Sequence, residues 1–283
     1  GCCGERFSLM LTLKNEALQV LVDPEHGGRI VSFVELRGGT EFVCYDPRRL
    51  PVDPSLDYDG NFAGGFDELL PNDPPEDGFP DHGELWTLPL TAEWEKNALR
   101  LSGTLPLSRL RYERRMCLDG NALISEYRLV NTGKRSLDFL WKLHAALRIA
   151  EGDCFMAPAG CVQAADPGEW SLAADGMPRR WPGKYPIPGR NGRSDFFYLT
   201  DLDRGELVLK RADGHVFTCR YAPEVFACAW VFASFGRLND AYTLIMEPAT
   251  NYPCSLAGAR KSRTCAGLNP GETLAATVRW QAE

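Results

Sequence analysis

The sequence predicts an all-β protein, a large antiparallel sandwich or barrel, formed by a single domain over residues 1–283. Runs rich in β-branched and aromatic residues recur about every ten residues, and turn residues separate them. Helix-period patterns are scarce, and neither a repeat nor a low-complexity tract divides the chain. A length of 283 residues also suits one large β domain.

The predicted strands form three groups along the chain. Asp119-Gly120-Asn121 and Asn131-Thr132-Gly133 interrupt alternating runs in the middle group, and they predict hairpin turns because Gly and Asn tolerate positive φ. The predicted runs are 8–15, 17–23, 29–38 and 41–45; then 90–105, 110–118, 122–130 and 136–149; and finally 205–212, 215–222, 225–235, 241–248 and 273–281.

Two long segments lack this rhythm. Residues 50–82 are rich in Pro, Gly and Asp, and residues 157–196 are rich in Pro, Gly and Arg. Long irregular insertions in a compact β domain usually carry function, so we expect both segments to be functional loops.

Composition and charge exclude several classes of protein. The net charge of −7 argues against nucleic-acid binding. No run of eighteen apolar residues is present, which predicts no membrane association, and residues 1–10 lack the features of a signal peptide. The ten cysteines form no Cys-x-x-Cys pair, which favours reduced thiols in a cytoplasmic protein.

One segment accounts for the acidic character. Residues 50–95 contain twelve of the 38 carboxylates and none of the 31 lysines and arginines. This segment leads into His82, so we expect it to form one rim of a site that prefers a neutral or cationic ligand.

The histidines differ in their surroundings. His26 and His215 lie in turns, where histidines are usually solvated. His82 lies within the acidic segment, whereas His144 lies in an apolar run. Because side chains alternate along a strand, His144 shares one face with Lys142, which indicates a lined cleft or a satisfied core histidine.

A late glutamate is the third candidate. Glu247 closes an apolar run directly before Pro248, so it either ends a strand at the surface or points into a cleft. Burial raises the pKa of a carboxyl group, which suits a general acid or base.

These residues together resemble the aldose 1-epimerase (galactose mutarotase-like) superfamily. The motifs are Gly27-Gly28-Arg29-Ile30-Val31-Ser32, His82-Gly83, His144, Glu247 and Leu268-Asn269-Pro270-Gly271-Glu272, and their order spans nearly the whole chain. The chain departs from the family where Glu84-Leu85-Trp86 follows His82-Gly83, because an arginine is common there. The resemblance implies a large antiparallel β-supersandwich.

The resemblance also implies a reaction and its residues. Glu247 would be the base that takes the proton of the C1 hydroxyl, His144 the acid that protonates the ring oxygen, and His82 a group that orients the sugar. The partner would be a small-molecule sugar, and neither a metal nor an organic cofactor is required. The candidate sugar ligands are Asn61, Asp67, Glu68, Trp86, Trp141 and Lys142. Asp73, Glu76 and Asp77 are interpreted instead as a solvated turn.

Several alternatives stay open, as do the sugar and the oligomeric state. A hexose-6-phosphate 1-epimerase would need arginines on the phosphate, for which Arg29 or the arginines of 179–193 are candidates. A non-catalytic carbohydrate-binding protein would keep the aromatic platform without the Glu–His pair. The acidic segment could hold a structural Ca²⁺, although no EF-hand loop is present. No nucleophile elbow occurs. A glycoside hydrolase stays open because carboxylates are abundant, although nothing in the sequence pairs two of them.

Overall fold

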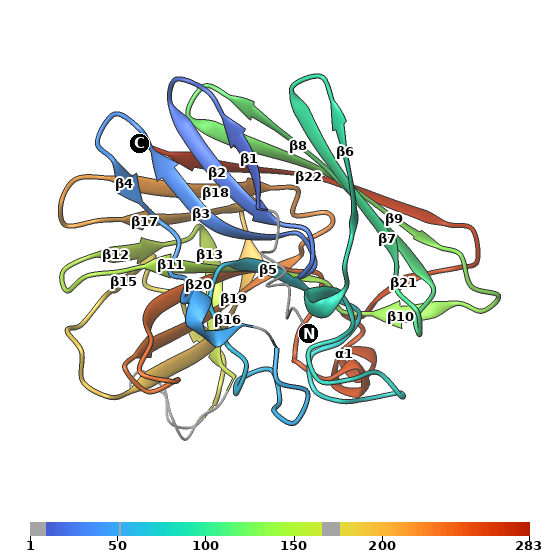
Figure 1. The fold of residues 1–283 in the computed structure, drawn as a ribbon. Coiled ribbons are helices and arrows are strands. Elements are labelled where there is room, and N and C mark those ends of the chain that lie inside the picture. Colours follow the sequence, from blue (N-terminus) through green and yellow to red (C-terminus); the bar gives the residue numbers. More distant parts are fainter. Residues whose placement is uncertain (1–9, 51, 166–175) are drawn as a thin grey trace.

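The structure is a computed structural model that describes residues 10–50, 52–165 and 176–283. In this part of the chain, eleven strands form one antiparallel sheet, with the order β1-β2-β3-β5-β11-β20-β19-β16-β13-β14 and β4 paired to β3 (Figure 1). The strands of this first sheet are β1 Leu11–Lys14, β2 Leu18–Asp23, β3 Arg29–Glu35, β4 Thr40–Glu41, β5 Phe66–Leu69, β11 Lys142–Arg148, β13 Ala159–Ala164, β14 Arg179–Arg180, β16 Ser194–Leu202, β19 Cys228–Phe235 and β20 Tyr242–Ala249.

A second antiparallel sheet packs against the first. Its order among the described residues is β15-β12-β17-β18-β22-β9-β8-β7-β6. The strands are β6 Thr91–Glu95, β7 Ala98–Thr104, β8 Leu110–Asp119, β9 Ala122–Asn131, β12 Cys154–Met156, β15 Lys184–Pro186, β17 Glu206–Lys210, β18 Val216–Tyr221 and β22 Thr273–Ala282. The remaining elements are the pair β10 Leu137–Phe139 and β21 Ala266–Leu268, the helix α1 Leu256–Ser262, and the short 3₁₀ turns η1 Pro47–Arg49 and η2 Leu85–Thr87.

Aromatic side chains fill the space between the sheets. Phe33 and Phe66 of the first sheet contact Phe217 and Trp280 of the second, with ring centroids 5.3 Å apart for Phe33–Phe217 and 5.4 Å apart for Phe66–Trp280. Such pairs add specific geometry to the burial of apolar surface. The predicted all-β sandwich is confirmed.

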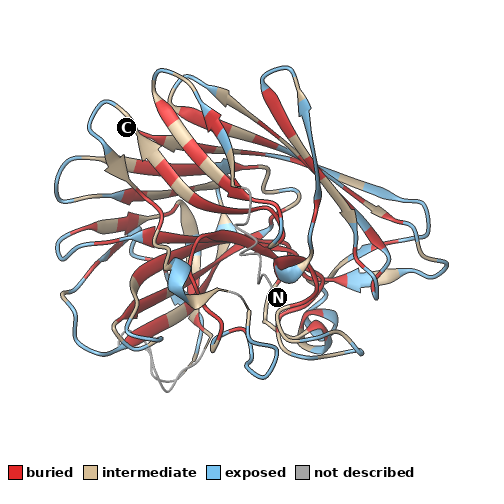
Figure 2. Ribbon diagram, in the orientation of Figure 1, coloured by how far each residue is buried: buried red, intermediate tan, exposed pale blue. Residues whose placement is uncertain are grey.

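Burial patterns show which strands are covered on both faces. Along β8 buried and more exposed residues alternate, as expected for a strand with one solvated face. In contrast, β11 and β20 are buried along almost their whole length (Figure 2). The second sheet covers one face of these two strands, and the other face lies beneath loops.

Only one of the two predicted hairpin turns joins paired strands. The turn at Asp119-Gly120-Asn121 connects β8 to β9, and Gly120 has a φ of 56°. The prediction for Asn131-Thr132-Gly133 is wrong, because β9 leads into β10, which pairs with β21 instead. The Asn131 amide ties this segment to the carbonyls of Arg135 and Leu268, and a sequence-local signal does not reveal that distant partner.

Two further properties concern the described residues. None of their helices is long and apolar enough to cross a membrane. Their eight cysteines are free thiols, while Cys2 and Cys3 lie outside the described residues, as does 166–175 of the second predicted loop.

Candidate active site

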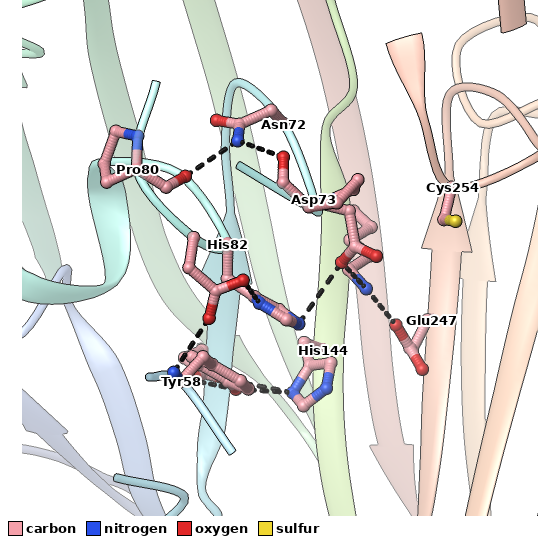
Figure 3. Close-up of polar contacts among 12 residues, drawn as sticks. Tyr58, Asn72, Asp73, Pro80, His82, His144, Glu247 and Cys254 are labelled. Carbon is pink, nitrogen blue, oxygen red and sulfur yellow. Dashed lines mark hydrogen bonds and ion pairs between the residues drawn. The ribbon is translucent and has the colours of Figure 1, made fainter. Parts of the chain in front are cut away.

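A cavity of about 200 Å³ lies on the face of the first sheet that is turned away from the second sheet. His82, His144 and Glu247, which the sequence predicts as the acid–base groups, all line it (Figure 3). The structure therefore brings together three residues that are far apart in the chain. The complete lining is Tyr58, Asp59, Phe62, Asp73, His82, Lys142, His144, Phe196, Phe232, Leu238, Ile245 and Glu247.

The register of the sheet places His144 and Glu247 side by side. Lys142 pairs with Ala249 and Ala145 with Met246, so His144 of β11 lies opposite Glu247 of β20. On the far side of His144, β5 brings Asp67 directly opposite it. Because residues directly opposite one another point to the same face, Asp67, His144 and Glu247 form a row on this face of the sheet, and His144 and Glu247 of that row line the cavity.

Asp67 orients the imidazole of His144. Its Oδ1 lies 2.9 Å from His144 Nδ1, and the Tyr58 hydroxyl donates a 2.8 Å hydrogen bond to its Oδ2. Arg29 is also buried and lies 3.3 Å from the same carboxylate. A carboxylate on Nδ1 fixes the ring orientation and leaves Nε2 for a ligand.

The environment of Asp67 predicts how stability depends on pH. Burial opposes its ionisation, but Arg29 and the hydrogen-bonded His144 outweigh burial and lower the pKa of Asp67. The folded state therefore binds fewer protons than the unfolded state, in which the carboxyl has a pKa of about 3.9. The resulting contribution to the free energy of unfolding is present above about pH 4 and is lost as the pH falls through the folded pKa.

We expect Asp67→Asn to weaken this acid dependence. The variant should be less stable than the wild type at pH 7, and the difference between them should shrink toward pH 3. Urea unfolding at several pH values measures the effect. If the free energy of unfolding depends on pH in the same way for both proteins, Asp67 is not the source of the acid dependence.

His82 is held by the loop that follows β5. It has a φ of 56° and Gly83 a φ of 78°, so both occupy the left-handed region that few non-glycine residues adopt. A Cβ on Gly83 would lie 2.2 Å from the Leu70 carbonyl oxygen, so only glycine fits there. The ring of His82 stacks on Tyr58 at 4.2 Å, with Asp81 2.9 Å from its Nδ1.

Lys142 connects the two sides of the cavity. Its Nζ lies 2.6 Å from Asp73 Oδ1 and 3.1 Å from Glu247 Oε2, and it also lies 4.3 Å from the centre of the Trp230 ring. Burial acts against the charged amine, but Asp73 and Glu247 raise the pKa of Lys142 above its usual value. His82 Nε2 lies 3.3 Å from the same Asp73 oxygen, which completes a chain of polar contacts from Glu247 to His82.

The sequence interpretation of Asp73 as part of a solvated turn is wrong. Asp73 is buried, and although burial opposes its ionisation, Lys142 and His82 lower its pKa. Its neighbours have other structural tasks: Glu76 accepts hydrogen bonds from the Leu256 and Ala257 amides at the start of α1, and Asp77 pairs with Arg260. The available clue was Lys142, since a buried lysine requires a counter-ion and the acidic segment is rich in carboxylates.

Five of the predicted sugar ligands do not line the cavity; of the six, Lys142 alone does so. The Asn61 amide is occupied by backbone groups of its own loop, at Asp53, Leu56 and Asp57. Asp67 lies behind His144 and contacts the cavity only through it. Each of these residues is buried for reasons that the local sequence does not reveal.

The other three residues point elsewhere. Glu68 and Trp141 hydrogen-bond to each other at 3.1 Å inside the core between the sheets, because they lie on the opposite strand face from Asp67 and Lys142. Trp86 packs edge-on against Tyr58 and lines a separate surface cleft. The aromatic walls of the cavity are instead Tyr58, Phe62, Phe196 and Phe232.

The carboxylates proposed for Ca²⁺ are distributed among different partners. Asp67 faces His144, Glu68 faces Arg114, and Asp73 faces Lys142. Within the described ranges no group of three or more His, Cys, Asp or Glu side chains could hold a metal ion.

The molecule is thus a β protein of two large sheets with a cavity whose floor carries an oriented histidine beside a glutamate. No family model matches the chain, and no curated protein matches it. Solved structures do match it over nearly its full length. The Slr1438 protein from Synechocystis sp. PCC 6803 is 19% identical with a TM-score of 0.77, covering 97% of this chain and 96% of that one.

Two further matches bear the name of the superfamily. A galactose mutarotase related enzyme from Lactobacillus acidophilus is 12% identical with a TM-score of 0.71, covering 97% of both chains. A galactose mutarotase-like protein from Lactobacillus casei ATCC 334 is 12% identical with a TM-score of 0.67, covering 97% of this chain and all of that one. The chain therefore has the galactose mutarotase-like fold that the resemblance predicts.

Proposed function

We propose that this protein is an aldose 1-epimerase-like isomerase, which interconverts the α and β anomers of a free sugar. The observation that carries the proposal is the cross-strand placement of His144 beside Glu247 in one cavity, with Asp67 holding the far nitrogen of the imidazole. An acid and a base on adjacent strands can reach the ring oxygen and the C1 hydroxyl of one sugar, which is what anomer exchange requires.

Glu247 and His144 each carry out one proton transfer in the reaction. Glu247 takes the proton from the C1 hydroxyl while His144 gives the proton on Nε2 to the ring oxygen. The C1–O5 bond breaks as the C1=O bond forms, and C1 then rotates about the C1–C2 bond. In ring closure on the other face, His144 takes back the proton of the C5 hydroxyl and Glu247 gives its proton to the carbonyl oxygen of C1, so that both side chains regain their starting state.

Lys142 supports the role of Glu247 as base, and Asp67 supports the role of His144 as acid. Lys142 lies 3.1 Å from Glu247, where its charge stabilises the carboxylate that acts as base. Asp67 similarly stabilises the imidazolium that acts as acid. His82 and Asp73 lie next to this pair and can hold sugar hydroxyls.

The charge of the cavity supports a free sugar over a sugar phosphate. Its lining contains Lys142 against the three carboxylates Asp59, Asp73 and Glu247, and no arginine of the described residues lines it. Arg29, one of the candidates for binding a phosphate, is paired with Asp67 beneath the floor. A phosphate dianion would meet net repulsion here.

A mutarotation assay tests the proposal. Freshly dissolved α-anomers of several aldoses, and of glucose 6-phosphate, are followed by polarimetry with and without protein. We expect faster equilibration of at least one free sugar and none of the phosphate ester. Binding of a sugar without faster equilibration would favour the carbohydrate-binding alternative, and acceleration of the phosphate alone would favour the hexose-6-phosphate 1-epimerase.

A further inference from the structure

Lys142 is shared by two carboxylates of the cavity. Its Nζ lies 2.6 Å from Asp73 Oδ1 and 3.1 Å from Glu247 Oε2, and all three side chains line the cavity. The side chains of Lys142 and Glu247 are only 3% and 1% exposed. Glu247 alone would balance the charge of the lysine, so the second carboxylate, Asp73, is not needed to neutralise it in the resting protein.

The fold holds Asp73 next to Lys142 through contacts of its loop. The His82 amide donates to the Asp73 carbonyl at 2.6 Å, and His82 Nε2 lies 3.3 Å from Asp73 Oδ1 (Figure 3). The Leu140 amide donates to the Pro71 carbonyl at 2.8 Å, which ties this loop to the segment that leads into Lys142. The position of the Asp73 carboxylate is therefore fixed from both its own loop and the strand beside it.

The other groups around Glu247 do not offset the charge of Lys142 in the same way. Asp59 lines the cavity but is exposed, so solvent screens its charge. Trp230 lies opposite Glu247 on β19 and 4.3 Å from Lys142 Nζ, but an indole carries no charge. Burial raises the pKa of three further groups, which are therefore neutral near pH 7: Tyr58, Tyr198 and Cys254. The titratable groups that then remain around Glu247 in the cavity are Asp73, His82, Lys142 and His144.

The proposed reaction requires Glu247 to change its charge in every turnover, and the present inference rests on that proposed function. When Glu247 takes the proton of the C1 hydroxyl it becomes neutral, and Lys142 loses the partner on that side. A buried ammonium group that loses its carboxylate is strongly unfavourable. With Glu247 as its only partner, Lys142 would therefore oppose the proton transfer.

We propose that Asp73 is a positioning residue, which keeps Lys142 ion-paired while Glu247 is neutral and so allows Glu247 to act as the base. Asp73 suits this task because it stays charged: burial opposes its ionisation, but Lys142 and His82 lower its pKa. The Asp73 carboxylate acts through Lys142 and takes no proton from the sugar.

Asp73→Asn tests the proposal by mutarotation kinetics. The variant keeps the pair of Lys142 and Glu247, so its charges stay balanced and it should fold. Without Asp73, the ammonium group holds Glu247 charged to lower pH and makes it a poorer proton acceptor. We expect kcat at pH 7 to fall about three- to tenfold, and the acid limb of the pH profile to move down by at least about half a pH unit.

Other outcomes would overturn the proposal. A change confined to KM would mean that Asp73 binds sugar hydroxyls, and a lower rate with an unmoved acid limb would mean a structural role. Asp73→Glu keeps the charge and should restore the acid limb. Asp77→Asn makes the same change on the same loop, at a side chain that is 43% exposed and pairs with Arg260, so it should leave kcat, KM and the pH profile unchanged.

A double variant shows whether Asp73 acts through Lys142. Lys142→Met leaves Asp73 and Glu247 as two neighbouring buried carboxylates, which favours a shared proton and removes the free base. Asp73→Asn in this background frees Glu247, so the double variant should be more active at pH 7 than Lys142→Met alone. Lower activity in the double variant would overturn the proposal, and this comparison decides even where Asp73→Asn alone fails to fold.

A measurement without sugar separates this proposal from the proposed function. Carbon NMR of isotope-labelled glutamate, with the Glu247 signal assigned by its absence from Glu247→Gln, follows the protonation of Glu247 directly. A lower titration midpoint in Asp73→Asn than in wild type would support Asp73 as the group that offsets Lys142, even where the wild type accelerates no sugar and the isomerase proposal fails. Equal midpoints would overturn the role of Asp73 and leave the isomerase proposal intact.

Discussion

Replacing Glu247 with glutamine is expected to lower kcat/KM for mutarotation by about 10²–10⁴-fold, the usual contribution of a general acid–base group. Glutamine has the shape of glutamate and its amide oxygen can still accept from Lys142, which lies 3.1 Å away. It cannot take the proton from the C1 hydroxyl, however. Polarimetry of the preferred sugar, with spontaneous mutarotation subtracted, measures the loss.

The control keeps the change in charge but moves it away from the cavity. Glu95→Gln on β6 removes a surface carboxylate that pairs with Arg100 and Arg115, so it should leave both the rate and the fold unchanged. Sugar binding by Glu247→Gln should stay within a few-fold of wild type, which separates a lost proton acceptor from a damaged cavity. Full activity in Glu247→Gln would rule out Glu247 as the base.

The family resemblance selected His144 and Glu247 as candidates, whereas the local pattern around each left a structural role open. His144 alternates with Lys142 in an apolar run, and Glu247 ends an apolar run before Pro248. In the structure both runs are central strands of the first sheet, and the polar residues of one strand face meet in the cavity. Alternation correctly placed His144 and Lys142 on one strand face, but it did not show that this face lines a cavity.

The same alternation explains why the prediction of Asp67 and Glu68 as sugar ligands failed. Asp67 and Glu68 are adjacent on β5, so one must point toward the cavity face and the other into the core. A local sequence does not specify which face is which, and both were predicted as sugar ligands. The choice depends on β11 and β8, which lie beside and behind β5 and are distant in the chain.

Loop residues were harder to predict for a different reason. Tyr58 stacks on His82, and Asp73 binds Lys142, through contacts that span 24 and 69 positions in the sequence. Such contacts depend on the conformation of the loops, and loop conformation produces no periodic pattern in the sequence. The Asn61 amide is consumed by backbone groups for the same reason.

Replacing Arg114 with methionine is expected to destabilise the protein by about 3–5 kcal/mol, because it leaves a carboxylate buried without its partner. Arg114 of β8 crosses the core to Glu68 of β5, with Nη1 3.3 Å from Oε1, and both side chains are almost fully buried. The pair therefore links the two sheets. Burial already raises the pKa of Glu68 although Arg114 opposes it, so loss of Arg114 should drive Glu68 toward its neutral form.

The pH dependence distinguishes this cause from lost packing. With a raised pKa in the folded state, Glu68 keeps a proton that the unfolded chain releases above about pH 4.3. The free energy of unfolding of Arg114→Met should therefore fall, relative to wild type, as the pH rises above that value toward the folded pKa. Urea unfolding at pH 5 and pH 8 measures the difference.

A second substitution removes the stranded charge. Glu68→Gln in the Arg114→Met background keeps an oxygen that can accept from Trp141 Nε1, which lies 3.1 Å from Glu68 Oε2, but it carries no charge. Replacing both members of a buried ion pair with neutral groups usually costs much less than removing one, so the double variant should recover most of the lost stability and lose its pH dependence. If the double variant stays as unstable as Arg114→Met, the loss instead comes from the hydrogen bonds that Arg114 makes to Ser125 and the Gly28 carbonyl.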